Sequence, residues 1–190
     1  MLSPPGPAER RRLLAGLAEP PEAAARFLLG KVLVRRRRGT PLAARIVETE
    51  AYLGEGDPAA HSYRGQTPRN APLFARPGTL YVYFIYGMHH CLNIAVMPEG
   101  TPGCVLIRAV EPLPGVPLGA RDGAGPGRLC RALALDRRHS GRWLFSPDSP
   151  LALREGPPPR RVRVSPRIGI RHAADQPLRF FDPASPALSR

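Results

Sequence analysis

The sequence has little of what a membrane-spanning, exported or cysteine-stabilised protein would need. None of its apolar runs reaches the length of about eighteen residues that a membrane-spanning helix requires. The first twenty residues carry no apolar segment followed by a cleavage site, which argues against a signal peptide and favours a cytoplasmic protein. The three cysteines form no Cys-x-x-Cys pair, so we expect buried thiols rather than a zinc finger or an iron–sulfur cluster.

Lysine is almost absent, since Lys31 is the only one and every other basic side chain is arginine. The 28 basic and 15 acidic residues give a net charge of +13, which suits a polyanion and most simply nucleic acid. A coding bias toward arginine can explain the lack of lysine, but it does not remove the excess of positive charge. With 43% hydrophobic residues, the chain is expected to fold rather than remain disordered.

The sequence patterns predict the α+β class. We expect a single compact domain over residues 1–190, with a curved, mostly antiparallel β-sheet, short flanking helices and a protruding β-hairpin. Helix formers predict helices over residues 8–30 and 128–135, and residues 1–20 and 181–190 are expected to be loosely ordered. Strands are expected over residues 31–34, 45–52, 79–86, 90–97, 104–110, 161–164 and 167–170.

Residues 53–78 form a long predicted loop, and a loop of this length in a compact domain is usually functional. In the strand before it, alternation places Glu48, Glu50 and Tyr52 on one face and Val47, Thr49 and Ala51 on the other. Carboxylates beside apolar residues in a strand are costly unless they are paired or functional. The alternative is an edge strand with a solvated acidic face.

Three later strands also carry polar groups in apolar surroundings. Tyr81, Tyr83 and Ile85 share one strand face, which suits either a binding surface or a packed aromatic strand, while Tyr86 borders the turn. Asn93 needs hydrogen-bond partners within an apolar strand. Arg108 stands in another apolar strand, where a buried carboxylate is its expected partner.

Several motifs occur together in a fixed order. They are Glu50-Ala51-Tyr52, Ala60-His61-Ser62, Thr67-Pro68-Arg69-Asn70, Pro77 to Tyr83, Tyr86-Gly87-Met88, Asn93-Ile94, Arg108 to Pro112 and Gly125 to Leu129. In this order the chain resembles the alkyladenine (3-methyladenine) DNA glycosylase family over roughly residues 27–181. The resemblance implies a base-excision-repair enzyme that flips an alkylated purine from duplex DNA and hydrolyses its N-glycosidic bond.

The resemblance also implies roles for individual residues. Glu50 would hold and deprotonate the attacking water, and Arg108 would help to position that water, with the carbonyl of Ile168 as a further ligand. The flipped base would stack between Tyr52 on one side and His61 with Tyr83 on the other.

Further residues are implied to select the base and hold the DNA. Asn93 would crowd the exocyclic amine of normal guanine, which disfavours undamaged purines. Tyr86 would intercalate into the gap left by the flipped nucleotide. The remaining expected DNA contacts are Thr67, Arg69, Met88, His89 and Arg128.

The expected partner is double-stranded DNA containing alkylated purines, bound by a monomer without a cofactor, a metal or a membrane. A bifunctional glycosylase needs an amine for a Schiff base, and the only lysine, Lys31, lies on an expected scaffold strand. We therefore expect a monofunctional enzyme without lyase activity, apart from any chance reaction of the N-terminal amine. His89 and His90 stand where family members often carry aromatic residues. A metal site is not expected there, because the sequence offers no third ligand at a suitable spacing.

Two other classes of protein compete with the enzyme. One is a non-catalytic nucleic-acid-binding module, because the fold resembles the C-terminal domain of methionyl-tRNA formyltransferase. A pure binding module, however, needs no buried carboxylate such as Glu50. The other is a basic structural protein of the ribosome, which the mixed strands and the lack of lysine-rich tails disfavour.

Overall fold

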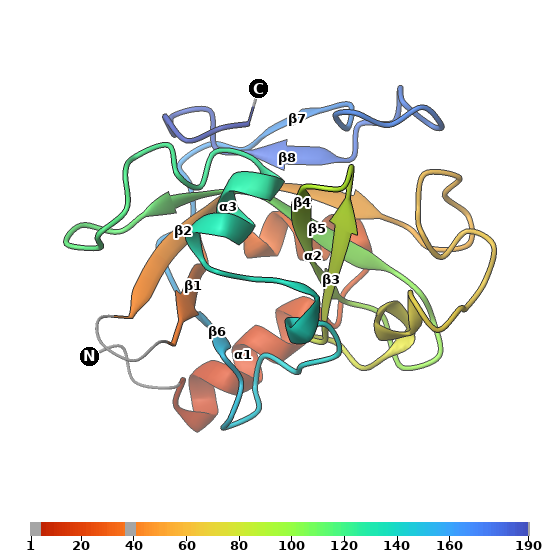
Figure 1. Ribbon diagram of the computed structural model, residues 1–190, viewed down its shortest axis with the longest axis horizontal. Coiled ribbons are helices and arrows are strands. Elements are labelled where there is room, and N and C mark those ends of the chain that lie inside the picture. The colour runs from red at the N-terminus through yellow and green to blue at the C-terminus, as the bar shows by residue number, and fades with distance from the viewer. Residues whose placement is uncertain (1–4, 37–40, 190) are drawn as a thin grey trace.

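A computed structural model describes residues 5–36 and 41–189 and shows a curled antiparallel sheet with helices packed against it (Figure 1). The strand order is β3-β4-β5-β2-β1-β6, and a further pair, β7 and β8, joins β2 through β8. This arrangement confirms the α+β class with a mostly antiparallel sheet. The strands are β1 Val32–Arg35, β2 Leu42–Tyr52, β3 Leu80–Ile85, β4 His89–Ala95, β5 Cys104–Pro112, β6 Leu151–Arg154, β7 Arg163–Ser165 and β8 Arg179–Phe181.

The helices cover the core face of the sheet. They are α1 Pro7–Leu17, α2 Pro21–Leu28 and α3 Pro126–Ala132. The chain also has short 3-10 helices, η1 Ala71–Phe74 and η2 Arg137–His139, and η1 packs on the other face of the sheet with Tyr81 and Cys104. Alternate residues of β3, β4 and β5 point into the same core as side chains of all three helices. The buried members from these strands and helices include Leu80, Val82, Leu92, Ile94, Val105, Ile107, Leu17, Leu28 and Leu129. The side chains on the opposite face of these strands lie outside this core.

The single helix expected over residues 8–30 is wrong, because the chain forms α1 and α2 with a break at residues 18–20. Pro20 and Pro21 explain the break, since proline has no N–H to donate and clashes with the preceding turn. The three thiols are buried and free, as predicted.

The C-terminal half differs most from the prediction. Residues 167–170 do not form a strand: Gly169 has a φ of 75°, and Ile168 directs its N–H to a carboxylate instead of a strand partner. β6 and β8 were not predicted, since both are short and are defined by pairing with distant strands.

Loosely ordered ends were also expected, and the described residues near both ends make packing contacts or hydrogen bonds with the rest of the chain. Leu13 and Leu17 of α1 are fully buried. At the other end, Ala187 is buried and Ser189 hydrogen-bonds to a side chain of β2. Residues 1–4 and 190 lie outside the described residues.

Candidate functional site

A cavity of about 370 Å³ lies on the sheet face opposite the main core. The strand register explains its composition: Glu50 of β2 pairs with Leu106 of β5, which pairs with Asn93 of β4, which pairs with Tyr81 of β3. One row of side chains therefore crosses four strands and points to the same side. The next rows add Tyr52, Cys104, Cys91 and Tyr83. Segments 59–61 and 168–170 and the start of α3 complete the wall.

Two bulges bring Arg108 to the carboxylates of β2. Ile46 pairs with Val110 and Glu48 with Ala109, so Val47 is an extra residue on β2. Thr49 then pairs with Ile107, so Arg108 is an extra residue on β5. Strict alternation predicts Val47 on the same face of β2 as Thr49. That prediction is wrong, because the bulge turns Val47 away from this face and it packs with Ala109 and Ala187.

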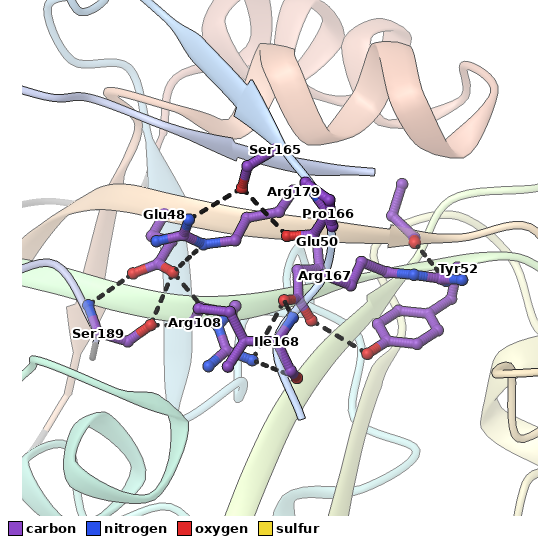
Figure 2. A network of polar contacts seen from close by, with 11 residues as sticks. Glu48, Glu50, Tyr52, Arg108, Ser165, Pro166, Arg167, Ile168, Arg179 and Ser189 are labelled. Carbon is purple, nitrogen blue, oxygen red and sulfur yellow. Dashed lines mark hydrogen bonds and ion pairs between the residues drawn. The ribbon is translucent and has the colours of Figure 1, made fainter. Parts of the chain in front are cut away.

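Glu50 is fully buried and lies at the centre of a polar network (Figure 2). Its Oε1 accepts the N–H of Ile168 at 2.8 Å and lies 3.2 Å from Arg108 Nη1. Its Oε2 accepts the hydroxyl of Tyr52 at 3.0 Å. Burial raises the pKa of Glu50 above its ordinary value of 4.5, while Arg108, Ile168 and Tyr52 oppose that rise.

Glu48 supports Arg108 from the other side and is also fully buried. Its Oε1 accepts from Arg108 Nε at 3.3 Å and from Arg179 Nε at 2.6 Å. The backbone N–H of Ser189 donates to Glu48 Oε2 and its hydroxyl donates to Oε1, each at 2.7 Å. The solvated acidic face considered for this strand is therefore excluded, and the buried carboxylate partner expected for Arg108 is confirmed, with two carboxylates rather than one.

Aromatic rings form the opposite wall of the cavity. The rings of His61 and Tyr83 lie 4.5 Å apart at 68°, and Tyr81 stacks on Tyr83 at 5.4 Å. His61 Nδ1 lies 3.0 Å from the hydroxyl of Tyr81. Desolvation, with a smaller contribution from the positive charge of Arg69, lowers the pKa of His61, so this imidazole is uncharged near neutral pH.

Asn93 is held rigidly at the cavity wall. Its Nδ2 donates to the Tyr81 carbonyl at 3.3 Å, and its Oδ1 accepts from the Cys104 thiol at 3.8 Å. Burial raises the pKa of Cys104 to about 12, so the thiol keeps its proton and can donate. Both ends of the amide are thus fixed in orientation.

The expected DNA-contacting residues fall into two groups. Tyr86 and His89 line the cavity mouth, and Tyr86 and Met88 are 76% and 69% exposed in the β3–β4 turn. Arg69 and Arg128 are exposed beyond the cavity, Arg69 on a second groove beside β3 and Arg128 on α3.

Thr67 is exposed as well, and it also forms hydrogen bonds within its own loop. Its N–H donates to Asn70 Oδ1 at 2.6 Å, and its hydroxyl accepts from the Asn70 N–H at 3.3 Å. Asn70 was not singled out from the sequence, although it belongs to a motif that was. Its buried side chain also donates to the carbonyls of His61 and Gly65 and so orders this part of the loop.

Asp57 and Arg167 were likewise not selected as site residues. They form a buried ion pair behind Tyr52. An acidic residue in the loop and an arginine 110 positions away carry no local signal that they meet. In the part of the chain that the structure describes, no three His, Cys, Asp or Glu side chains are grouped to hold a metal ion. No helix of that part is long and apolar enough to cross a membrane.

Comparison with known proteins places the sequence among its relatives. A sequence model described as methylpurine-DNA glycosylase (MPG) matches residues 15–186. A Koribacter versatilis protein named "Putative 3-methyladenine DNA glycosylase" is 48% identical over 182 residues, covering 89% of this chain and 88% of that protein. Proteins of the same name from Myxococcus xanthus and Synechococcus elongatus are each 48% identical, covering 86% and 92% of this chain and 86% and 88% of their own length.

Proposed function

The chain belongs to the methylpurine-DNA glycosylase family, and on that premise we propose that it flips an alkylated purine out of duplex DNA into the cavity and leaves an intact abasic site. It is a DNA-repair hydrolase of N-glycosyl bonds that acts on DNA in base excision repair. 3-Methyladenine and related lesions are the proposed substrates. One observation carries the proposal: Glu50 is fully buried, yet three groups that line the cavity contact its carboxylate.

Glu50 is the proposed general base. A carboxylate offers about four acceptor sites, and Ile168, Arg108 and Tyr52 use three of them in Glu50. The remaining site on Oε2 is the one proposed to accept a proton from water. As the bond from C1′ to the base breaks, its electrons leave with the base and the sugar becomes positively charged. The water oxygen then bonds to C1′ while its proton passes to Glu50.

The charges around Glu50 suit this reaction. Glu48 and Glu50 carry two negative charges, and Arg108 and Arg179 carry two positive charges, so the network is neutral as a group. Arg108 favours the ionised form of Glu50 and keeps the carboxylate in place without leaving a net positive charge beside the sugar. A transient cation at C1′ is therefore stabilised by a carboxylate that is already oriented.

The aromatic walls are proposed to hold the flipped base between Tyr52 and the pair formed by His61 and Tyr83. An uncharged His61 does not repel a cationic lesion. Asn93, fixed at both ends, is proposed to exclude the amine of normal guanine. Tyr86 is proposed to fill the gap in the duplex, and the residues proposed to contact the DNA are Thr67, Arg69, Met88, His89 and Arg128.

The absence of lyase activity is also proposed. The only lysine, Lys31, lies next to β1 and pairs with Glu155 at 2.9 Å. It does not line the cavity and cannot form a Schiff base there. We further propose that the enzyme acts as a monomer, as one domain, in the cytoplasm.

Release of free base from methylated duplex DNA, without added metal, tests the function. We expect the wild type to release 3-methyladenine and Glu50→Gln to lose about 100-fold or more in single-turnover rate. Glu111→Gln, which changes a carboxylate paired with Arg45 outside the cavity, is the control and should remain active. If neither the wild type nor Glu50→Gln releases base while both bind DNA, the non-catalytic binding module is the better description.

A further inference from the structure

A buried ion pair links the long loop to the segment after β7. Arg167 Nη2 donates to Asp57 Oδ1 at 2.9 Å, Arg167 Nη1 donates to Oδ2, and both side chains are fully buried. Nη1 also donates to the carbonyl of Ala51 at 3.0 Å. Asp57 in turn accepts the N–H groups of Leu53 and Ala59. The pair therefore connects the end of β2, the start of the loop and residue 167.

The same guanidinium lies over the ring of Tyr52, with its central carbon 4.6 Å from the ring centroid. Tyr52 lines the cavity, whereas Arg167 does not and is fully buried. The cation thus covers the ring from the protein side, and the cavity side is left for a ligand. Figure 2 shows Arg167 beside Tyr52, with Ile168 leading on to Glu50.

The residue after Arg167 belongs to the network of the general base. The N–H of Ile168 donates to Glu50 at 2.8 Å, and its carbonyl lies 3.5 Å from Arg108 Nη1. A single buried side chain thereby fixes both a stacking ring and the backbone that holds the carboxylate.

From these contacts we propose that Arg167, anchored by Asp57, is a positioning residue that clamps Tyr52 and weakens the preference of its ring for cationic over neutral purines. The inference rests on the function proposed above. An aromatic face attracts cations, but the positive end of the Asp57–Arg167 pair already occupies one face of Tyr52. Arg167 draws the π electrons of the ring toward itself, so the ring attracts a second cation on the cavity side less strongly. Stacking of a neutral base does not carry this penalty.

Equilibrium binding isolates this effect from catalysis. In the Glu50→Gln background, we would measure the affinity for duplexes that carry cationic 7-methylguanine or neutral hypoxanthine. The test variant is Asp57→Asn with Arg167→Gln, which removes both charges but retains groups that can hydrogen-bond. The ratio of cationic to neutral affinity should rise by about threefold to tenfold.

Two comparisons make the result specific. Arg45→Gln with Asp182→Asn removes another partly buried Arg–Asp pair, 2.9 Å apart, that does not line the cavity, and should leave the ratio unchanged. With Tyr52→Leu added, the loss of the Asp57–Arg167 charges should no longer change the ratio, because the ring is gone. An unchanged ratio in the test variant, an equal rise in the control, or an equal rise without Tyr52 would each overturn the inference. Failure of the proposed function is recognised separately, as no release of base when Glu50 is present.

Discussion

At the scale of single residues, the chemistry depends on a carboxylate that is both buried and ionisable. Burial favours the protonated form of Glu50, while three polar contacts favour the ionised form. The net result is a pKa above the ordinary value, so the base is active only above that raised pKa. The activity of the enzyme should therefore fall on acidification before an exposed glutamate would be protonated.

Tyr52→Phe tests this balance. The tyrosine hydroxyl donates to Glu50, and its loss should raise the pKa of Glu50 further. In the pH profile of the single-turnover rate, we expect the acid limb to move to higher pH. The rate on the plateau should fall less than the rate at acidic pH. Phe84→Leu, which alters an exposed aromatic outside the network, is the control. An acid limb that stays in place or moves to lower pH in Tyr52→Phe would contradict this assignment of the base.

Asn93→Ala tests the exclusion of normal guanine. An unfavourable polar contact costs about 1–3 kcal/mol, so its removal should increase the release of undamaged guanine by about 5- to 150-fold. Free guanine from unmethylated duplex DNA would be quantified beside the release of 3-methyladenine. A proportional loss of both activities would show that Asn93 only supports the cavity wall, through its bond to Tyr81.

At the scale of elements, the loop between β2 and β3 and the β3–β4 turn carry the groups that meet DNA. The turn has a backbone bond from Met88 N–H to the carbonyl of Ile85 and positive φ angles at Tyr86 (54°) and Gly87 (66°), as in a type I′ turn. Glycine accepts this conformation, whereas tyrosine does so only with strain. The strained residue is also the most exposed large hydrophobic side chain among those described, which supports a function for it.

Tyr86→Asn separates the turn from the contact with DNA. Asparagine tolerates a positive φ, so the thermal midpoint should be unchanged or higher. Loss of the ring should weaken binding to lesion-containing duplex by about 5- to 150-fold, as expected for one stacked aromatic. Tyr63→Asn, at another exposed tyrosine, serves as the control for binding. Unchanged affinity in Tyr86→Asn would exclude intercalation by this residue.

Asn70→Ala tests the order of the loop. The side chain of Asn70 bonds to Thr67, His61 and Gly65, so its removal should increase hydrogen exchange over residues 58–70 and weaken lesion binding. Gln66→Ala changes an exposed residue of the same loop and should do neither. Faster exchange without weaker binding would mean that His61 does not depend on this bonding.

At the scale of the whole molecule, the charge of +13 predicts binding that depends strongly on salt. The logarithm of DNA affinity should fall linearly with the logarithm of salt concentration, by about 0.9 for each phosphate contacted. Arg128→Ala should reduce this slope by about one unit. Arg11→Ala, at an exposed site on α1, none of whose residues lines the cavity, should leave the slope unchanged. Equal effects of both variants would indicate a diffuse charge rather than a DNA-binding face.

The sequence by itself determined the class of the fold and most of the cavity face. Alternation within β2 and β3 is a local property of an extended chain, and it correctly grouped Glu50 with Tyr52 and Tyr81 with Tyr83. Ordered motifs likewise identified the family, because they depend only on the order of residues along the chain.

Only the tertiary structure decided which residues, distant in the sequence, contact the residues of the cavity face. The bulges at Val47 and Arg108 break the alternation, and nothing local in the sequence marks them. Arg167 meets Asp57, and Ser189 meets Glu48, across 110 and 141 positions. Such contacts depend on the register of the strands and on how the distant segments pack together. A shift of one residue in the register of a strand would move each of its side chains to the other face of the sheet.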